Sequence, residues 1–469
     1  MKRIDFEHGT ITGNILGAAL PMLVAQLLSL LYNIVDRIYI ARIPDVGTTA
    51  LGAVGLCFPI IVIITAFSNL FGTGGAPLFS IFRGKKDPDT ARRIMNTSFT
   101  MLCVCAMVLM AVGFLFARPI LILFGASAEA IVYAYPYMML YLIGTLPSMI
   151  AVGMNPFINA QGYSSIGMLS VAIGAGTNLV LDPLFIFALG LGVRGAAIAT
   201  VISQCISAAL VVRCLVKETG PLRLDFRQLK IYPIKLKQIM QVGIPAGIQG
   251  MLFSLANVTV QSSVNSFGEV IMAGSSAAIS IEQFIYSNIN AFYQANVAFT
   301  SQNYGAGDYR RIKKIAMISV VTGVVTTELL SVLAVYFGPQ LLGIYSPSAE
   351  VVAAGMVRLR WIALFYGLDA IMDVIVGSLR GVGYNILPML VTLMGACASR
   401  LIWLSTVFRL PAYHRIEMVY IVYPLSWVLT ATTHLICYFF VSRKVDRELR
   451  AHEAELAARM EESPEEADS

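Results

Sequence analysis

Long apolar runs separated by short polar loops cover most of this chain. Twelve of them are long enough to cross a bilayer as helices of about 20 residues. They lie at 12–40, 51–80, 94–116, 130–157, 164–190, 194–216, 238–266, 273–300, 315–337, 352–377, 385–408 and 418–441. The pattern predicts an all-α polytopic membrane protein with twelve transmembrane helices, some of them tilted or kinked because their runs exceed the bilayer thickness.

Composition agrees with a membrane protein. Hydrophobic residues make up 57% of the chain and charged residues only 13%, whereas a soluble domain averages about 25% charged residues. The net charge of +6 does not indicate nucleic-acid binding, because the basic residues lie in short loops and form no basic stripe on a polar helix. We therefore expect the lipid bilayer, and no nucleic acid, among the partners.

The second half of the chain repeats the first at a fixed spacing of 221 residues. Eleven positions recur with the same or a similar residue, among them Gly84, Asp87, Ser127, Glu129, Gly162 and Tyr163, which recur as Gly305, Asp308, Ser348, Glu350, Gly383 and Tyr384. A single spacing that relates so many positions indicates that the chain arose by duplication. In a membrane protein, two similar halves are typical of a transporter that works between them.

Basic loops predict the topology and the domain bounds. Lys and Arg concentrate in loops 83–93, 217–237 and 310–314, which marks these loops as cytoplasmic. Both termini are then cytoplasmic, in a multi-pass protein of the cell membrane, and six spans in each half make the two repeats parallel. The predicted domains are an N-lobe (1–217), a linker (218–237), a C-lobe (238–442) and a charged cytoplasmic tail (443–469).

Polar residues inside spans of the first half are functional candidates, because an ionisable group is costly within a membrane. Asp36, Asp182 and Thr200 lie at similar depths from one end of their spans, and Asn178 is one turn before Asp182. Two carboxylates in low dielectric cannot both stay ionised cheaply, so the pair could take up a proton; with the amide and hydroxyl oxygens it could instead hold Na⁺. The structural alternatives are an Arg37 salt bridge for Asp36 and a helix-break hydrogen bond for Asp182.

The second half carries its own intramembrane acids. They are Glu282, Glu328, Asp369 and Asp373. Asp369 and Asp373 share a helix face, and Arg400 is an available partner for Glu328 or for either aspartate. Ion pairing is at least as strong an expectation as function here, because buried charges are usually paired. Arg358 and Arg360 lie near one end of the span 352–377 and can extend toward the membrane surface.

Several short motifs resemble the multidrug and toxic compound extrusion (MATE) transporters, and most closely their DinF/MepA-like branch. The motifs are Asn33-Ile-Val-Asp36-Arg, Asn155-Pro156, Gln161-Gly162, Asn178 with Asp182-Pro183, Glu282-Gln283 and Gln302-Asn303-Tyr304-Gly305. The resemblance covers about residues 10–442. It implies two six-helix lobes around a central cavity and export of drug-like molecules, amphipathic and cationic, in exchange for H⁺ or Na⁺.

The resemblance also assigns site residues. It implies cation binding by Asp36, Asn178, Asp182, Thr200 and Asn155, with Pro21 as the hinge of the first helix. Further candidates for the substrate cavity are Tyr137, Glu282, Asp369 and Asp373. The stretch 253–263 lacks the acid that other branches carry there, which favours coupling through the first lobe. We expect no cofactor besides the coupling ion, and a monomer.

Two other functions compete with drug export. A flippase for lipid-linked precursors would need basic groups to hold a phosphate, and Arg400 is the main intramembrane candidate. A membrane-embedded enzyme would need a carboxylate metal site or a His–Asp pair. In the sequence, neither arrangement is found around any of the four histidines, which are His8, His414, His434 and His452. We therefore do not expect an enzyme.

Overall fold

The protein is helical throughout the part of the chain that the structure describes. The computed structural model describes residues 3–44, 46–218 and 220–462, with side chains up to residue 447, and it contains no strand there. The last residues of the predicted tail, 463–469, lie outside the described residues. The chain divides into two compact units: the first holds 1–9, 16–83 and 87–248, and the second holds 10–15, 84–86 and 249–469.

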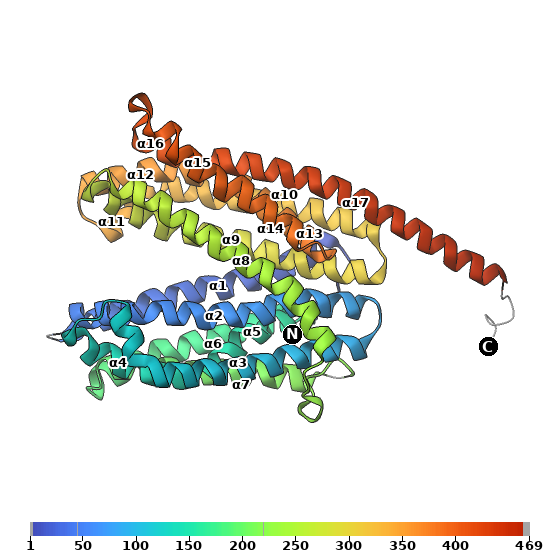
Figure 1. Cartoon of the computed structure of the whole chain (residues 1–469), viewed down its shortest axis with the longest axis horizontal. Helices are drawn as coiled ribbons and strands as arrows, with labels where there is room; N and C mark the ends of the chain where they lie inside the picture. Colours follow the sequence, from blue (N-terminus) through green and yellow to red (C-terminus); the bar gives the residue numbers. More distant parts are fainter. Residues whose placement is uncertain (1–2, 45, 219, 463–469) are drawn as a thin grey trace. The chain divides into compact units, whose positions relative to one another are not determined.

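The helices of the first unit follow one another with short connections (Figure 1). In chain order they are α1 (Ile11–Ala41), α2 (Gly47–Gly84), α3 (Pro88–Leu123), α4 (Ala128–Ile143), α5 (Thr145–Ala160), α6 (Ser164–Pro183), the π-helix η1 (Leu184–Ala188) and α7 (Val193–Lys217). The 3₁₀ turn η2 (Phe226–Gln228) leads into α8 (Pro233–Asn265), within which the first unit ends. Helices α4 and α5 are bent by 56° against each other, so the predicted span 130–157 is broken at Gly144.

The helices of the second unit are interrupted more often than those of the first. Its elements are α9 (Glu269–Ala306), α10 (Tyr309–Tyr336), α11 (Gly338–Tyr345), α12 (Ala349–Ile362), η3 (Ala363–Phe365), α13 (Tyr366–Gly381), α14 (Ile386–Thr392), the π-helix η4 (Leu393–Ala398), α15 (Ser399–Ser405), η5 (Val407–Arg409), η6 (Pro411–Tyr413), α16 (Ile416–Tyr420) and α17 (Val422–Glu462). Figure 1 shows α17 extending well past its neighbours α10 and α13.

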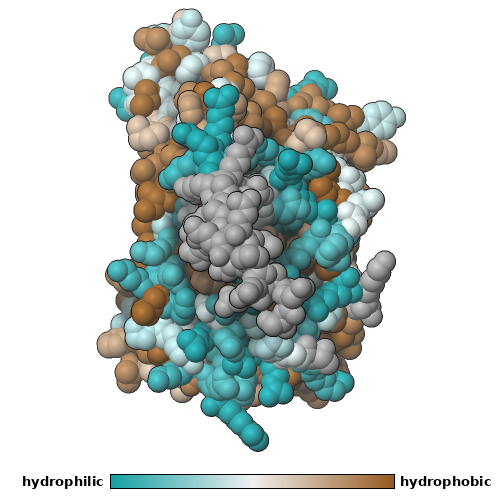
Figure 2. All heavy atoms as spheres, turned by 90° about the vertical axis from the view of Figure 1, so that its right-hand side faces the viewer, coloured by the Kyte–Doolittle hydropathy of each residue, from teal (hydrophilic) through white to brown (hydrophobic). Residues whose placement is uncertain are grey.

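Ten helical segments of the described chain are long and apolar enough to span a membrane, or eleven if the bent pair α4–α5 is one span. The one predicted span that is left, 273–300, is the eighth along the chain and falls on α9. This helix is 38 residues long but is not among those segments, because Asn288, Gln294 and Asn296 and other polar residues interrupt its apolar sequence. Hydrophilic side chains gather at one end of the helices, and hydrophobic side chains cover the flanks (Figure 2). Which end faces the cytoplasm stays a prediction.

The repeat has a physical basis in the local structure. Asp87 caps α3 by accepting a hydrogen bond from Thr90 N, and Asp308 caps α10 by accepting one from Arg311 N, both at 3.0 Å. Glycine recurs where the backbone turns left-handed, with φ of +89° at Gly162 and +93° at Gly383, a conformation that favours glycine. These repeated positions are therefore helix starts and turns, where a particular residue type is needed.

Candidate functional site

The first unit gathers polar side chains from α6 and α7. The Nδ2 atom of Asn178 donates to Asp182 Oδ1 at 3.2 Å and lies 3.4 Å from Thr200 Oγ1. Asn178 is 2% exposed and Asp182 is 0% exposed. The predicted spacing of four residues thus places the amide and the carboxyl on one helix face, and the neighbouring helix adds the hydroxyl.

Asp36 brings a second carboxyl to this cluster from α1. It lies within hydrogen-bonding range of the Asp182 carboxyl. Asp36 Oδ1 and Asp182 Oδ2 are nevertheless buried without a hydrogen-bond partner. An ionised carboxylate only accepts hydrogen bonds, so the two groups face each other without a donor. A bound cation would supply what this pair lacks.

The contacts show neither of the structural alternatives, which were a salt bridge between Asp36 and Arg37 and a hydrogen bond of Asp182 at the helix break. The Arg37 guanidinium lies over the Phe58 ring at 5.7 Å, and among the described residues no ion pair joins it to Asp36. Asp182 accepts from the side chain of Asn178 and not from a backbone group of the helix break. Neither carboxyl therefore forms an ion pair among the described residues, although the Arg37 charge acts on Asp36 from further away.

A change of helix type follows Asp182 directly. Pro183 has no backbone N–H and cannot continue the hydrogen-bond ladder, and α6 passes into the π-helix η1 at this point. The Phe187 ring in η1 packs edge-on against Tyr39 of α1, with ring centroids 6.3 Å apart. This contact fixes α1 beside the end of α6, near Asp36. Helix α1 runs unbroken through Pro21, whose role as a hinge stays a prediction.

Three tyrosines lie near the carboxyl pair. Tyr137 of α4 is 3% exposed and stacks on Tyr141 with centroids 6.0 Å apart. Its phenol lies within electrostatic range of both Asp36 and Asp182. The sequence-based interpretation named Tyr137 but missed Tyr32 and Tyr141, which also lie near Asp36. Spacing could have found them, since Tyr32 is four residues before Asp36 and Tyr141 four after Tyr137.

Asn155 lies in a separate polar group. Its Nδ2 donates to Gly167 O at 3.2 Å and lies 3.4 Å from Ser170 Oγ, and its Oδ1 lies 3.4 Å from Asn159 Nδ2. Ser170 precedes Asn178 by eight residues on α6, about 12 Å along a helix. Of the five residues predicted to bind the cation, the structure therefore brings together four and leaves Asn155 two turns away.

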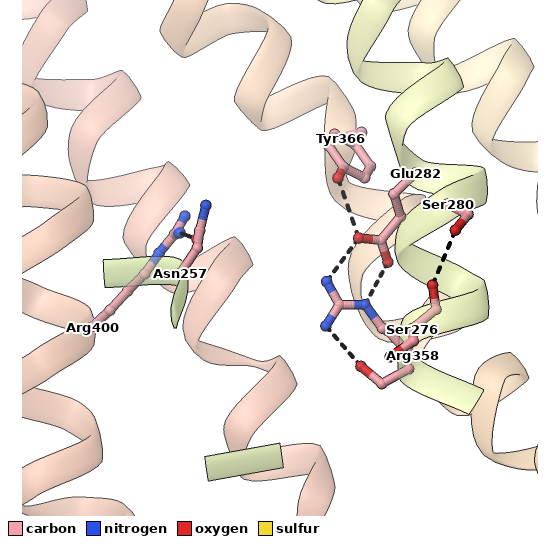
Figure 3. Close-up of polar contacts among 8 residues, drawn as sticks. Asn257, Ser276, Ser280, Glu282, Arg358, Tyr366 and Arg400 are labelled. Atoms are coloured by element: carbon pink, nitrogen blue, oxygen red, sulfur yellow. Dashed lines mark hydrogen bonds and ion pairs between the residues drawn. The ribbon is translucent and has the colours of Figure 1, made fainter. Parts of the chain in front are cut away.

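In the second unit, Glu282 of α9 has a basic partner (Figure 3). Arg358 of α12 donates to its two carboxylate oxygens from Nε at 2.9 Å and from Nη2 at 2.8 Å, and also to Ser275 Oγ at 3.2 Å. Arg358 is 3% exposed, so the expectation that it extends to the membrane surface is wrong. The ion pair gives Glu282 a structural partner, and its place in a substrate cavity stays a prediction.

The three remaining intramembrane acids of this unit form no ion pair among the described residues, and two of them accept hydrogen bonds from uncharged groups. Asp373 Oδ2 accepts from the Tyr286 hydroxyl at 3.4 Å, and Glu328 accepts from Gly367 N at 2.7 Å. Asp369 is buried, with Oδ1 lacking a partner. Their roles in substrate binding are likewise untested by these contacts.

Arg400 is fully buried but forms no ion pair with Glu328, Asp369 or Asp373 among the described residues. It donates instead to Asn257 Oδ1 (Figure 3) and to Ser426 Oγ, both at 3.0 Å. Its Nη2 has no partner.

Within the described residues, no group of three or more His, Cys, Asp or Glu side chains could hold a metal ion. Asp36, Asp182, Asn178 and Thr200 together offer carboxylate, amide and hydroxyl oxygens, which are the ligands that hard cations prefer; which cation binds stays a prediction.

Known proteins resemble the chain over most of its length. The MatE family model matches residues 21–184 and 245–403. The multidrug export protein MepA of Staphylococcus haemolyticus is 24% identical over 378 residues, which are 81% of this chain and 83% of that protein. The probable multidrug resistance protein YpnP of Bacillus subtilis is 25% identical over 392 residues, 82% of this chain and 85% of that protein.

Solved structures share the fold. The crystal structure of a MATE protein in the straight conformation aligns with a TM-score of 0.87 at 21% identity and covers 95% of this chain and 99% of that one. The outward-facing structure of a multidrug resistance MATE family transporter aligns with a TM-score of 0.86 at the same identity and coverage. Together with the family match and the apolar helices, this shows that the chain is a membrane protein of the MatE family of transporters.

Proposed function

We propose that this protein is a multidrug efflux transporter that exchanges amphipathic, cationic small molecules for a cation bound between Asp36 and Asp182. The export of drugs is supported by the relatives MepA and YpnP, which are named for multidrug export and resistance. The coupling is supported by one observation above all: each of the two facing carboxyls has a buried oxygen without a hydrogen-bond donor, and neither forms an ion pair among the described residues.

A proton is the coupling ion that this arrangement favours. One proton shared between the carboxyls removes a charge and supplies the missing donor at once. Binding Na⁺ would call for several oxygen ligands, but the Asn178 side chain turns its Nδ2 toward Asp182 and Thr200. In this orientation Na⁺ would take its ligands from the oxygens of Asp36, Asp182 and Thr200, without the Asn178 oxygen.

The substrate and the proton exchange because both are attracted to the same negatively charged carboxyl pair. A cationic substrate is attracted to the same carboxyls, and the Tyr137 and Tyr141 rings provide faces that also attract cations. Once Asp36 or Asp182 is protonated, that attraction weakens and the substrate leaves. The proton is released on the other side of the membrane after the lobes switch between outward-open and inward-open states.

The experiment is ethidium efflux from pump-deficient bacterial cells that express wild type, Asp36→Asn, Asp182→Asn or, as the control, Glu350→Gln, which removes an exposed acid outside both candidate sites. Each is run with the proton gradient intact, with it collapsed, and with a Na⁺ gradient instead. We expect efflux in wild type and in the control, driven by the proton gradient, and loss of efflux in both other variants. Normal efflux by Asp36→Asn and Asp182→Asn would refute the assignment of the coupling site.

A flippase for lipid-linked precursors is the second candidate, and one observation favours it: the buried guanidinium of Arg400 has an unpartnered Nη2 that could bind a phosphate oxygen. Two of its other nitrogens are already bound by Ser426 and Asn257, so this candidate ranks below drug export. Absence of ethidium efflux in well-expressed wild type would favour it, and Arg400→Met should then abolish flipping.

A further inference from the structure

A groove opens between the start of α6 and the end of α7, in the first unit and away from the carboxyl pair. Its volume is about 330 Å³, which is room for on the order of ten waters at ~30 Å³ each. This is more than an inorganic phosphate ion fills. We call it the α6–α7 groove.

One side of the α6–α7 groove is apolar. Ile166 and Leu169 of α6 and Leu210 of α7 line it. Leu169 is 39% exposed, so this apolar wall faces outward from the helices. Both helices are predicted membrane spans, and such a wall would lie against lipid chains.

The other side carries two cations without partners. Arg213 and Lys217 line the groove and are exposed on α7, four residues apart and therefore on one helix face. Among the described residues, no hydrogen bond or ion pair engages either side chain. Lys217 is the last residue of α7, so the two cations stand at the polar end of a predicted span, at the level of lipid headgroups.

The one acid of the groove is already neutralised. Glu218 lines it, but its carboxylate pairs with Arg3 at 3.6 Å. With this pair balanced, the charges of Arg213 and Lys217 remain available. An anion in the α6–α7 groove would meet two cations and no free carboxylate.

We propose that the α6–α7 groove binds an anionic phospholipid, with its phosphate against Arg213 and Lys217 and an acyl chain along the apolar wall. Arginine and lysine both bind phosphate oxygens by charge-assisted hydrogen bonds. The apolar wall distinguishes a phospholipid from a free phosphate ion, which would gain nothing from it. The inference does not depend on which ion or drug the protein transports.

The test is native mass spectrometry of the purified full chain in detergent, titrated with phosphatidylglycerol or phosphatidylcholine. The double variant Arg213→Ala with Lys217→Ala should bind phosphatidylglycerol about 30-fold more weakly than wild type, at about 1 kcal/mol per basic residue near an anionic lipid and 1.4 kcal/mol per tenfold. Binding of phosphatidylcholine should be weak in both proteins.

The matched control is Arg223→Ala with Arg227→Ala, which removes the same charge from exposed residues that do not line the groove. It should bind phosphatidylglycerol like wild type. An equal loss in both double variants would mean general charge attraction and would overturn the proposal, as would an unchanged affinity in the groove variant.

A third variant, Leu169→Trp, fills the groove from its apolar wall without changing the charge. It should also lose phosphatidylglycerol, and it provides a second test if the double variant does not fold. Full competition by millimolar inorganic phosphate, or normal lipid binding by Leu169→Trp, would overturn the proposal in favour of a site for free anions.

Discussion

Both units bury acidic residues, but the partners of these acids differ. In the first unit, Asp36 and Asp182 face each other with unpartnered oxygens and without an ion pair. In the second, Arg358 donates to both carboxylate oxygens of Glu282, the acid that contrasts with this pair. Asp373 accepts from the Tyr286 hydroxyl, and Asp369 keeps an unpartnered Oδ1. A buried acid with its own cation is part of the scaffold, whereas a pair of acids without one can accept a cation from outside. The comparison predicts opposite responses to mutation.

The largest effect is expected for Arg358→Met. It leaves the buried Glu282 carboxylate without its cation, which typically costs about 3–5 kcal/mol of stability. Unfolding of the detergent-solubilised protein measures it, with Arg360→Met as the control, because that neighbouring arginine is exposed. A loss below about 1 kcal/mol for Arg358→Met would mean that the pair is not structural.

A smaller loss is expected for Arg400→Met. The substitution leaves Asn257 Oδ1 and Ser426 Oγ without their donor, and an unmade buried hydrogen bond costs about 1–3 kcal/mol. No buried acid loses an ion-pair partner in this case. The same unfolding measurement applies, and a loss as large as that of Arg358→Met would show that Arg400 neutralises an acid such as Asp369 after all.

Next comes the helix cap Asp87, with an expected cost of about 1 kcal/mol for Asp87→Ala. The hydrogen bonds from the Thr90 side chain and backbone N–H lower the pKa of Asp87. Its contribution is therefore complete above the ordinary pKa of about 3.9 and is lost as the pH falls through the lowered folded value. Melting curves of wild type and Asp87→Ala should converge at low pH; a difference that does not depend on pH would exclude the carboxylate as the cap.

The smallest effect on stability is expected for Asp36→Asn, within about 1 kcal/mol of wild type and on the stabilising side. The amide removes one of two facing charges and can donate to Asp182. Thermal unfolding of Asp36→Asn is compared with that of Glu282→Gln, because Glu282→Gln should destabilise the protein. Strong destabilisation by Asp36→Asn would indicate that this carboxylate, too, has a structural partner.

Hydropathy and the repeat predicted much of the fold. The apolar runs gave most of the helices, and the repeated Asp87 and Asp308 turned out to be caps, because capping and turning depend on local residue types. The position of the bend between α4 and α5 was not foreseen, and α9 was predicted as a helix but not as one with so many polar residues. The polar residues of α9 are satisfied by distant partners, for example Asn296 by Val374 O at 2.6 Å, and hydropathy carries no information on such partners.

The candidate site was predictable where one helix carries it. Asn178 and Asp182 are one turn apart, so their contact followed from spacing, and the depths of Asp36 and Thr200 suggested the rest. The pairing of Glu282 with Arg358 joins residues 76 positions apart, and Asn155 belongs to another polar group. Both facts depend on how helices pack against each other, which the residue pattern alone does not determine.

The most direct test of the coupling site is to measure ion movement driven by substrate in proteoliposomes. Purified wild type, Asp182→Asn and the control Glu350→Gln are reconstituted with a pH-sensitive dye inside, and an ethidium gradient is applied with and without Na⁺. The account predicts ethidium-driven proton movement in wild type and in the control, independent of Na⁺, and none in Asp182→Asn. Proton movement that persists undiminished in Asp182→Asn would contradict it.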